Sequence, residues 1–189
     1  MPLCAPSGRL WSVPATALFT TADASMERLA QIRRLLFTAF DGTFSEEDWE
    51  HTLGGWHVVV TDGGVVIAHA AVVPRVLDVA DRPFHTGYVE GVATDPARQR
   101  EGLGSQAMAE VSKLLLDEFE MGALSTSVHQ FYQRLGWERW HGPTYVRHGA
   151  EVVRTEDEDD GVMVLRFGPS KDIDLTGSIS CESRLGDDW

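Results

Sequence analysis

The segment whose residues could do chemistry most directly is Gln99-Arg100-Glu101-Gly102-Leu103-Gly104, which follows a predicted strand and opens a predicted helix. Its two glycines allow the backbone to approach a ligand closely. The free N–H groups at the start of a helix favour anions. Arg98 and Arg100 add positive charge in a chain whose net charge is −13. Together these features predict a pyrophosphate-binding site.

The spacing of the glycines separates the classes of pyrophosphate site. A Walker A loop needs Gly-Lys-Ser/Thr, which this segment lacks. A Rossmann fingerprint opens a parallel β-α-β unit, whereas this segment follows a run of predicted strands. The remaining pattern, Gln/Arg-x-x-Gly-x-Gly/Ala after a strand, is similar to the acetyl-CoA signature of the GNAT superfamily of N-acetyltransferases. The alternative interpretation is a glycine-rich helix start without a ligand.

Hydrophobic periodicity and turn signals predict the elements that position this segment. Ser45 is expected to cap a short helix, and Asp62-Gly63-Gly64 indicates a hairpin. Helices are predicted at 23–40, 103–120 and 128–135, and strands at 56–61, 65–73, 75–80, 84–94, 124–127, 144–146 and 162–167. This order favours an α/β (α+β) fold: a mixed sheet of about seven strands with about four helices, in one domain over 1–189. Residues 1–15 are expected to be irregular.

Composition and charge exclude several classes of function. No stretch reaches the roughly 18 apolar residues of a membrane span, and the first residues lack a signal-peptide pattern, so a cytoplasmic location is expected. The net charge of −13 disfavours nucleic-acid binding. It suits a polycationic small molecule, although acidic surfaces also serve solubility. The cysteines and histidines show no metal-binding spacing, so no metal is expected.

Seven further segments narrow the resemblance within the GNAT superfamily. Their order and spacing resemble the aminoglycoside 2′-N-acetyltransferases of actinobacteria, from about residue 18 onward. The resemblance implies a GNAT fold, a homodimer, and transfer of the acetyl group of acetyl-CoA to the 2′-amine of aminoglycoside antibiotics, which confers resistance. The segments are 48–55, 68–72, 87–93, 122–125, 136–137, 140–144 and 186–189.

The resemblance also implies roles for individual residues. Glu90 is expected to act as the base that takes the proton of the amine through a water. The Val92 N–H is expected to polarise the thioester carbonyl, and Tyr132 to protonate the leaving thiolate. The implied acetyl-CoA site comprises Val92, Ala93, Thr94, Gln99, Arg100, Glu101, Gly102, Leu103 and Gly104. The implied antibiotic site comprises Thr43, Asp48, Glu90, Gly91, Ser125, Asp159, Asp160, Asp187 and the Trp189 carboxylate.

Some alternatives remain open at this stage. The family often has an acid where this chain has Thr43, so substrate preference can differ. The acidic loop aligns ambiguously between Glu158 and Asp159. Glu90 could bind ammonium groups without acting as a base, and Tyr132 could be a core aromatic. The enzyme could acetylate another cationic amine (a polyamine, a thiol-precursor amino sugar or a peptide N-terminus), or the protein could sequester aminoglycosides without catalysis.

Overall fold

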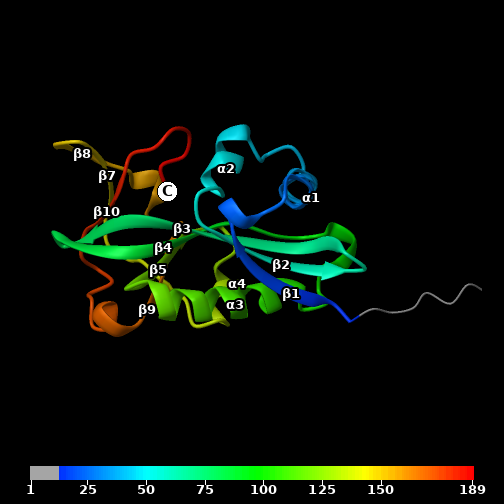
Figure 1. Cartoon of the computed structure of the whole chain (residues 1–189). Helices are drawn as coiled ribbons and strands as arrows, with labels where there is room; N and C mark the ends of the chain where they lie inside the picture. The colour runs from blue at the N-terminus through cyan, green and yellow to red at the C-terminus, as the bar shows by residue number, and fades with distance from the viewer. Residues whose placement is uncertain (1–12) are drawn as a thin grey trace, which may run out of the picture.

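The computed structural model describes residues 13–189. These residues form a mixed sheet of ten strands with four α-helices distributed over its two faces (Figure 1). The helices are α1 (Met26–Ala39), α2 (Glu46–His51), α3 (Leu103–Glu118) and α4 (His129–Gln133). The strands are β1 (Ala15–Thr20), β2 (Trp56–Asp62), β3 (Val65–Val79), β4 (Arg82–Thr94), β5 (Met121–Ser125), β6 (Glu138–Arg139), β7 (Thr144–His148), β8 (Glu151–Arg154), β9 (Val162–Arg166) and β10 (Ile179–Glu182).

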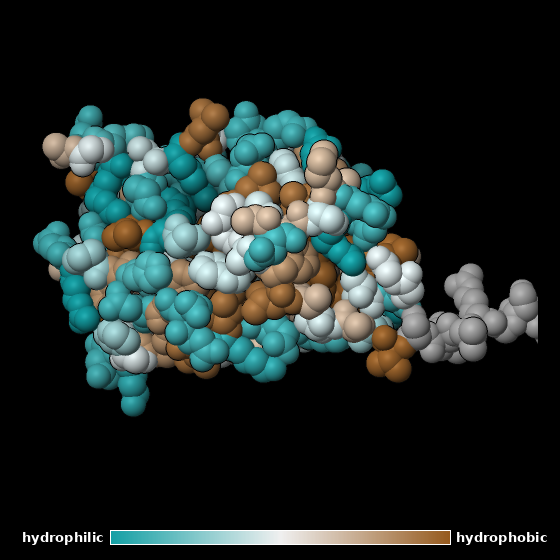
Figure 2. Space-filling view, viewed as in Figure 1, coloured by the Kyte–Doolittle hydropathy of each residue, from teal (hydrophilic) through white to brown (hydrophobic). Residues whose placement is uncertain are grey.

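The helices divide between the two faces of the sheet. In Figure 1, α1 and α2 lie on one side of the strands, and α3 and α4 lie on the other. The core follows this division. Ile32 and Leu36 of α1 pack with Val59 on one face, whereas Val111 and Leu115 of α3 belong to the larger cluster on the other. Figure 2 shows polar residues around the rim of this view and apolar residues gathered in its centre.

The strand order is β6-β9-β5-β4-β3-β10-β7-β8, and the β1–β2 pair lies beside the first half of β3. The sequence predicted two strands here, with a break at Pro74, but β3 is continuous. Pro74 lies after Val72, the last residue paired with β2, and before Asp78, which pairs with β10. Among residues 13–189, no strand pairs with that edge of β3 at Pro74, and an edge strand can accept a proline.

The strands that position the site are β4 and β5, which run parallel and then separate. Their pairing covers only Thr86–Met121, Gly87–Gly122 and Tyr88–Ala123. Beyond this point β4 carries a bulge, because two residues, Gly91 and Val92, lie opposite Ala70 alone on β3. Gly91 has a φ of 55°, a conformation that glycine adopts without strain. The result is a gap in the sheet beside the second half of β4.

The helix starts follow local signals in the sequence. Ser25 caps α1 by accepting the N–H of Arg28. Ser45 and Asp48 form a reciprocal capping box at α2, in which the Ser45 N–H donates to the Asp48 carboxylate over 2.8 Å. By contrast, the N-cap of α3 is Gly102, which has a φ of 82° and no side chain to cap the helix.

The predicted mixed sheet flanked by four helices is confirmed, but the strand boundaries required corrections. Ala15–Thr20 forms the edge strand β1, although residues up to about 15 were predicted to be irregular; the remainder of that prediction lies outside the described residues. Strands β6, β8 and β10 were not predicted, since each has four residues or fewer. No helix among residues 13–189 is long and apolar enough to cross a membrane.

Candidate active site

A cleft of about 1290 Å³ opens where β4 and β5 stop pairing. Its walls come from the α1–α2 segment, the second half of β4, the start of α3, the end of β5, α4 and the last residues of the chain. A site for one small molecule usually has roughly 300–1,000 Å³. This cleft therefore has room for two ligands that meet beside β4.

One end of the cleft has the properties of an anion site. Gly102 leaves the N–H groups of the first turn of α3 without a side-chain acceptor, and these groups have no partner within the helix. Gly104 is close to β4, because a Cβ there would lie 3.2 Å from Thr94 Oγ1. This backbone fits a pyrophosphate, as the sequence predicted. The predicted residues that line the cleft here are Val92, Ala93, Thr94, Gln99, Arg100, Gly102, Leu103 and Gly104.

Two charged side chains of this segment do not take the expected position. The Arg98 guanidinium donates to Asp62 at 3.0 Å and to Glu101 at 2.8 Å, so its charge is already balanced by two carboxylates. Glu101 does not line the cleft, because its side chain is turned towards Arg98. Among the arginines of this segment, Arg100 is the one that lines the cleft.

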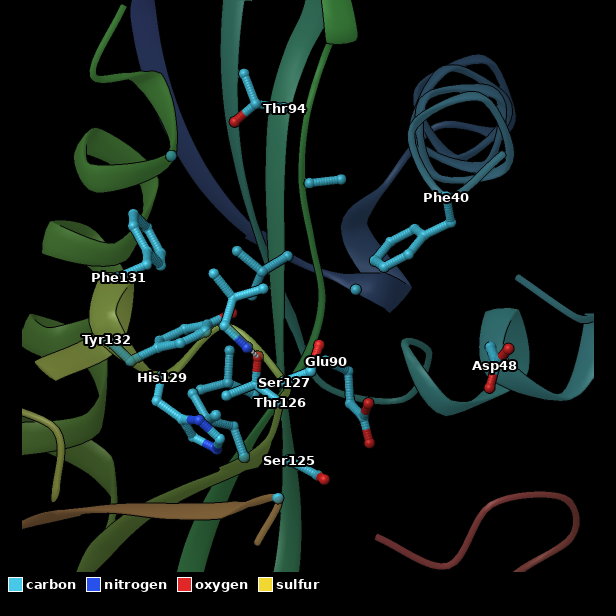
Figure 3. A pocket seen from close by; sticks show the side chains of 18 of the residues that line it. Phe40, Asp48, Glu90, Thr94, Ser125, Thr126, Ser127, His129, Phe131 and Tyr132 are labelled. Atoms are coloured by element: carbon cyan, nitrogen blue, oxygen red, sulfur yellow. Dashed lines mark hydrogen bonds between the residues drawn. The ribbon is translucent and has the colours of Figure 1, made fainter. Parts of the chain in front are cut away.

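Glu90 lies at the centre of the cleft, one residue before the bulge (Figure 3). Its side chain is only 16% exposed, and Arg184 Nη1 donates to Glu90 Oε1 over 2.6 Å. Burial raises the pKa of Glu90 to about 7, while the charge and hydrogen bond of Arg184 lower it. A carboxyl with this pKa can exchange a proton near neutral pH.

Tyr132 enters the cleft from α4, on the other side of Glu90 from Asp48 of α2 in the view of Figure 3. Its ring packs edge-on against Phe131 and Trp137, and 8% of the residue is exposed. Tyr132 is therefore both a core aromatic and a lining residue. Burial raises the pKa of the Tyr132 hydroxyl well above its ordinary value. The phenol therefore stays protonated at neutral pH, and its O–H remains available as a hydrogen-bond donor.

Carboxylates line the part of the cleft beyond the anion site. We call this group the acidic wall: Asp48, Glu90, Asp157, Asp160 and Asp187. They come from four separate parts of the chain. Asp48 uses one oxygen to cap α2, and Asp160 accepts a bond from Arg139 at 3.0 Å. Thr43, Gly91, Ser125 and Trp189 line the same end. The wall suits a ligand that carries several positive charges.

Asp159 was predicted as a substrate contact, and the structure places it elsewhere. Its carboxylate forms two hydrogen bonds with Arg154 and accepts the Thr144 N–H at 3.0 Å. These bonds lower the pKa of Asp159 to about 2. Asp159 does not line the cleft, whereas Asp157 does. Because Asp159 holds the acidic loop against β7, we assign it a structural role.

The sequence did not single out several lining residues, of which Arg184 is the most important. It reaches Glu90 across 94 residues of sequence, and its Nε also donates to the Asp187 carbonyl at 2.7 Å. His51 joins the same segment to α2, because its Nε2 donates to the Leu185 carbonyl at 2.7 Å. A motif cannot reveal such pairs. An unexplained arginine among the acids of 182–188 was the only available signal.

Comparisons with known proteins agree with this geometry. The family described as an acetyltransferase (GNAT) domain matches residues 21–140. The chain is 40% identical over 176 residues to an aminoglycoside 2′-N-acetyltransferase of Mycolicibacterium fortuitum, covering 91% of this chain and 90% of that one.

Two solved structures show the same fold. The GNAT family N-acetyltransferase YhbS of Escherichia coli, in complex with CoA, has a TM-score of 0.66 at 18% identity and matches 92% of this chain and 93% of its own. A GCN5-related N-acetyltransferase of Kribbella flavida has a TM-score of 0.57 at 23% identity over 69% of this chain; the match spans only 34% of that longer protein. The chain belongs to the aminoglycoside 2′-N-acetyltransferase family of the GNAT superfamily, and it is an acetyl-CoA-dependent acyltransferase.

Proposed function

We propose that this enzyme acetylates the 2′-amine of aminoglycoside antibiotics and thereby confers resistance to them. The observation that carries the proposal is the position of Glu90, which belongs to the acidic wall and lies on β4 just before Val92, Ala93 and Thr94 of the anion end of the cleft. The acidic wall attracts a polycation, and the anion site holds the pyrophosphate of the acetyl donor. Glu90 lies where the two would meet.

Acetyl-CoA supplies the thioester that the amine attacks. Val92, Ala93, Thr94 and the segment from Gln99 to Gly104 hold the donor through backbone N–H groups. The backbone N–H of Glu101 belongs to this cradle even though its side chain faces Arg98. Arg100 adds positive charge beside the pyrophosphate.

The acceptor site consists of Thr43, Asp48, Gly91, Ser125, Asp160, Asp187 and Trp189, with Asp157 in place of Asp159. Ammonium groups of the antibiotic bind the carboxylates, and Ser125 accepts or donates one hydrogen bond. Thr43 carries no charge, so it contributes no ion pair. The preference among aminoglycosides follows from which of their ammonium groups the remaining carboxylates reach.

The chemical step requires one proton acceptor, one oxyanion donor and one acid. Glu90 takes the proton of the 2′-ammonium through a water, which frees the nitrogen lone pair. The nitrogen then bonds to the acetyl carbon as the bond between carbon and sulfur breaks. The Val92 N–H stabilises the charge that develops on the thioester oxygen. Tyr132 donates its proton to the departing sulfur. The nitrogen, now bonded to the acetyl carbon, releases its second proton to water, which restores the Tyr132 hydroxyl, and the proton on Glu90 returns to solvent.

The location and assembly are also part of the proposal. The family resemblance supports a cytoplasmic homodimer built from one domain over 1–189. The net charge of −13 disfavours nucleic acid and anionic membranes as partners. Size-exclusion chromatography with light scattering tests the dimer, since a monomer at micromolar concentration would contradict it.

A panel of aminoglycosides tests the proposed function. Gentamicin, tobramycin and kanamycin B carry a 2′-amine, whereas kanamycin A and amikacin carry a hydroxyl there. We expect release of CoA, detected as free thiol, with the first three only. Rapid turnover of amikacin would contradict the assignment of the 2′ position. Turnover of spermidine or a peptide N-terminus, but of no aminoglycoside, would point to another amine as substrate. Tight aminoglycoside binding without any turnover would indicate a sequestering protein.

A further inference from the structure

A chain of hydrogen bonds runs through the protein interior and ends on the bulge of β4. His57 on β2 and His69 on β3 are both completely buried. His69 Nδ1 lies 2.7 Å from the Gly91 carbonyl oxygen, and His69 Nε2 lies 3.0 Å from His57 Nδ1. His57 Nε2 lies 2.9 Å from the Thr21 hydroxyl, which accepts the Gly54 N–H at 3.0 Å. Neither histidine lines the cleft.

The position of each proton in this series of hydrogen bonds follows from its last acceptor, the Gly91 carbonyl oxygen. Burial lowers the pKa of His57 to about 4 and that of His69 to about 3, so both rings are neutral at pH 7. A carbonyl oxygen can only accept, so His69 Nδ1 must carry the proton. His69 Nε2 then accepts from His57 Nδ1, and His57 Nε2 accepts from the Thr21 hydroxyl. Each histidine nitrogen in this series has one assignment, whereas the Thr21 hydroxyl can also donate to the Gly55 carbonyl oxygen at 3.3 Å.

The bonded carbonyl of Gly91 belongs to the same peptide group as the Val92 N–H. A trans peptide is planar, and its C=O and N–H point in opposite directions. Since the carbonyl points to the His69 ring, the Val92 N–H points away from it. Gly91 and Val92 are skipped in the register of β3 with β4, so β3 offers this peptide no ladder position. The imidazole therefore takes the place of a strand partner in fixing the peptide.

We propose that His69 is a positioning residue for acetyl transfer: by holding the Gly91 carbonyl, it aims the Val92 N–H at the oxygen on which negative charge develops. His57 and Thr21 keep the His69 ring in the required tautomer. The inference rests on the proposed function for the role of Val92, and it adds three residues that do not touch either ligand. Two buried imidazoles would be a costly way to fill space, since buried polar groups are unfavourable unless they are paired.

The test compares three variants on β2 and β3. His69→Leu removes the donor. His69→Asn retains an N–H donor, since the Asn amide nitrogen occupies nearly the place of the His Nδ1. Val59→Ala is the control, because Val59 is fully buried and pairs directly with His69 across the strands, but its side chain donates no hydrogen bond. Each variant is assayed for kcat and KM with kanamycin B, for acetyl-CoA affinity by calorimetry, and for melting temperature.

We expect His69→Leu to lower kcat roughly 10-fold or more, because loss of a whole oxyanion donor costs about 10²–10³. Acetyl-CoA affinity should change less than threefold. His69→Asn should recover most of kcat, and Val59→Ala should lower the melting temperature without that loss of kcat. The pH midpoint of kcat/KM should stay in place in all variants, because neither histidine titrates near neutral pH. Equal losses of kcat in His69→Leu and Val59→Ala would overturn the inference.

Two NMR measurements keep the inference testable if a variant fails to fold or the proposed acceptor is wrong. In the wild-type protein at pH 7, the imidazole ¹⁵N spectrum should show the Nδ1–H tautomer for both histidines, and the Nε2–H tautomer of His69 would overturn the inference. Addition of acetyl-CoA should shift the Val92 amide proton downfield in the wild type and in Val59→Ala, but not in His69→Leu. These outcomes do not depend on the acceptor, whereas the aminoglycoside panel does.

Discussion

Arg184 Nη1 lies 2.6 Å from Glu90 Oε1, and each side chain is 16% exposed. Two opposing influences act on the pKa of Glu90. Burial raises the pKa of Glu90, and the Arg184 guanidinium opposes this effect, so that the pKa is about 7. Arg184 also donates to the carbonyl of Asp187, so Glu90 and residues 187–189 contact the same guanidinium. We expect this pair to set the pH range of the enzyme.

Replacement of Arg184 by Met should raise the pKa of Glu90 above about 7, because it removes the charge that stabilises the carboxylate. Glu90 acts as a base only when it is ionised. If the pKa rises by one unit, roughly a tenth of the carboxyl is ionised at pH 7 instead of about half. The acid limb of kcat/KM against pH should therefore move to higher pH, and activity should recover near pH 9. Arg184→Lys keeps the charge and is the matched control.

The Arg184 prediction also requires that residues 187–189 keep their position in the variants. Arg184 donates to the Asp187 carbonyl at 2.7 Å and to a Trp189 oxygen at 3.2 Å. Melting temperature and acetyl-CoA affinity are therefore measured beside the pH profile. An unchanged acid limb in a folded Arg184→Met protein would show that Glu90 does not control the rate.

Replacement of Glu90 by Gln separates its two possible roles. If Glu90 is the base, kcat should fall about 10-fold or more at pH 7 and less at pH 9, where more of the amine is already neutral. The acid limb near pH 7 should also disappear. If Glu90 only binds ammonium groups, KM should rise while kcat stays nearly constant. Steady-state kinetics at the two pH values distinguish these patterns.

The features that could be predicted from the sequence are those formed by residues close together in the chain. The segment from Gln99 to Gly104 was recognisable because a strand, a glycine loop and a helix start are adjacent in sequence, and its role in holding acetyl-CoA stays a prediction. The start of the following helix is also a local feature, since the N-cap of α3 is Gly102 within the same segment. The capping box of Ser45 and Asp48 was predictable for the same reason.

The misplaced and missed residues depend on partners far along the chain. Arg184 was missed because its partner, Glu90, is brought to it only by the sheet. Asp159 was assigned to the substrate from the family resemblance, although the acidic loop aligns ambiguously. The sequence does not reveal that Arg154 binds the Asp159 carboxylate, whereas Asp157 lines the cleft. Pro74 suggested a strand end, yet its effect depends on the absence of a neighbouring strand at that point.

Replacement of Gly104 by Asp should abolish binding of acetyl-CoA. A Cβ at this position would lie 3.2 Å from Thr94 Oγ1, and a carboxylate would face the pyrophosphate. Two like charges about 4 Å apart repel by about 4 kcal/mol at an effective dielectric near 20. We expect at least a 100-fold rise in Kd by calorimetry with CoA. Gly104→Ala, which adds the Cβ alone, should raise Kd only a few-fold. Unchanged affinity in a folded Asp variant would contradict the cradle.

The buried histidines should make the protein less stable in mild acid. The folded pKa of His57 is about 4, below the ordinary value of 6.5, so the unfolded chain binds a proton first as pH falls. The stability is complete above pH 6.5 and is lost as pH falls towards 4, at about 1.4 kcal/mol per pH unit. Glu90 has the opposite effect on stability below pH 7. Because its pKa is raised in the folded protein, the folded protein binds this proton before the unfolded chain does, which stabilises the fold as pH falls.

The contribution of His57 is measured by comparison with His57→Asn, since Glu90 titrates equally in both proteins. The free energy of unfolding, from urea titrations at pH 5.0, 5.5, 6.0 and 6.5, should fall less steeply in the variant. The difference in slope should be about 1.4 kcal/mol per pH unit. Equal slopes would show that His57 is protonated to the same extent in the folded and unfolded chain.

Replacement of Asp187 by Asn tests the attraction of the acidic wall for a polycation. Asp187 is exposed and lines the cleft, whereas the adjoining Trp189 is only 3% exposed and packs in the core. A point substitution therefore removes the charge without removing core packing. An exposed carboxylate beside an ammonium contributes about 0.2–1 kcal/mol, so KM for tobramycin should rise roughly twofold to fivefold. Acetyl-CoA affinity should not change, and the difference in KM should shrink in 0.5 M salt because salt screens the attraction.

Asp117→Asn makes the same charge change on the exposed surface of α3, outside the cleft lining, and should leave KM unaltered. Equal effects of the two substitutions would mean that net charge alone draws the antibiotic to the protein, without a contact at Asp187.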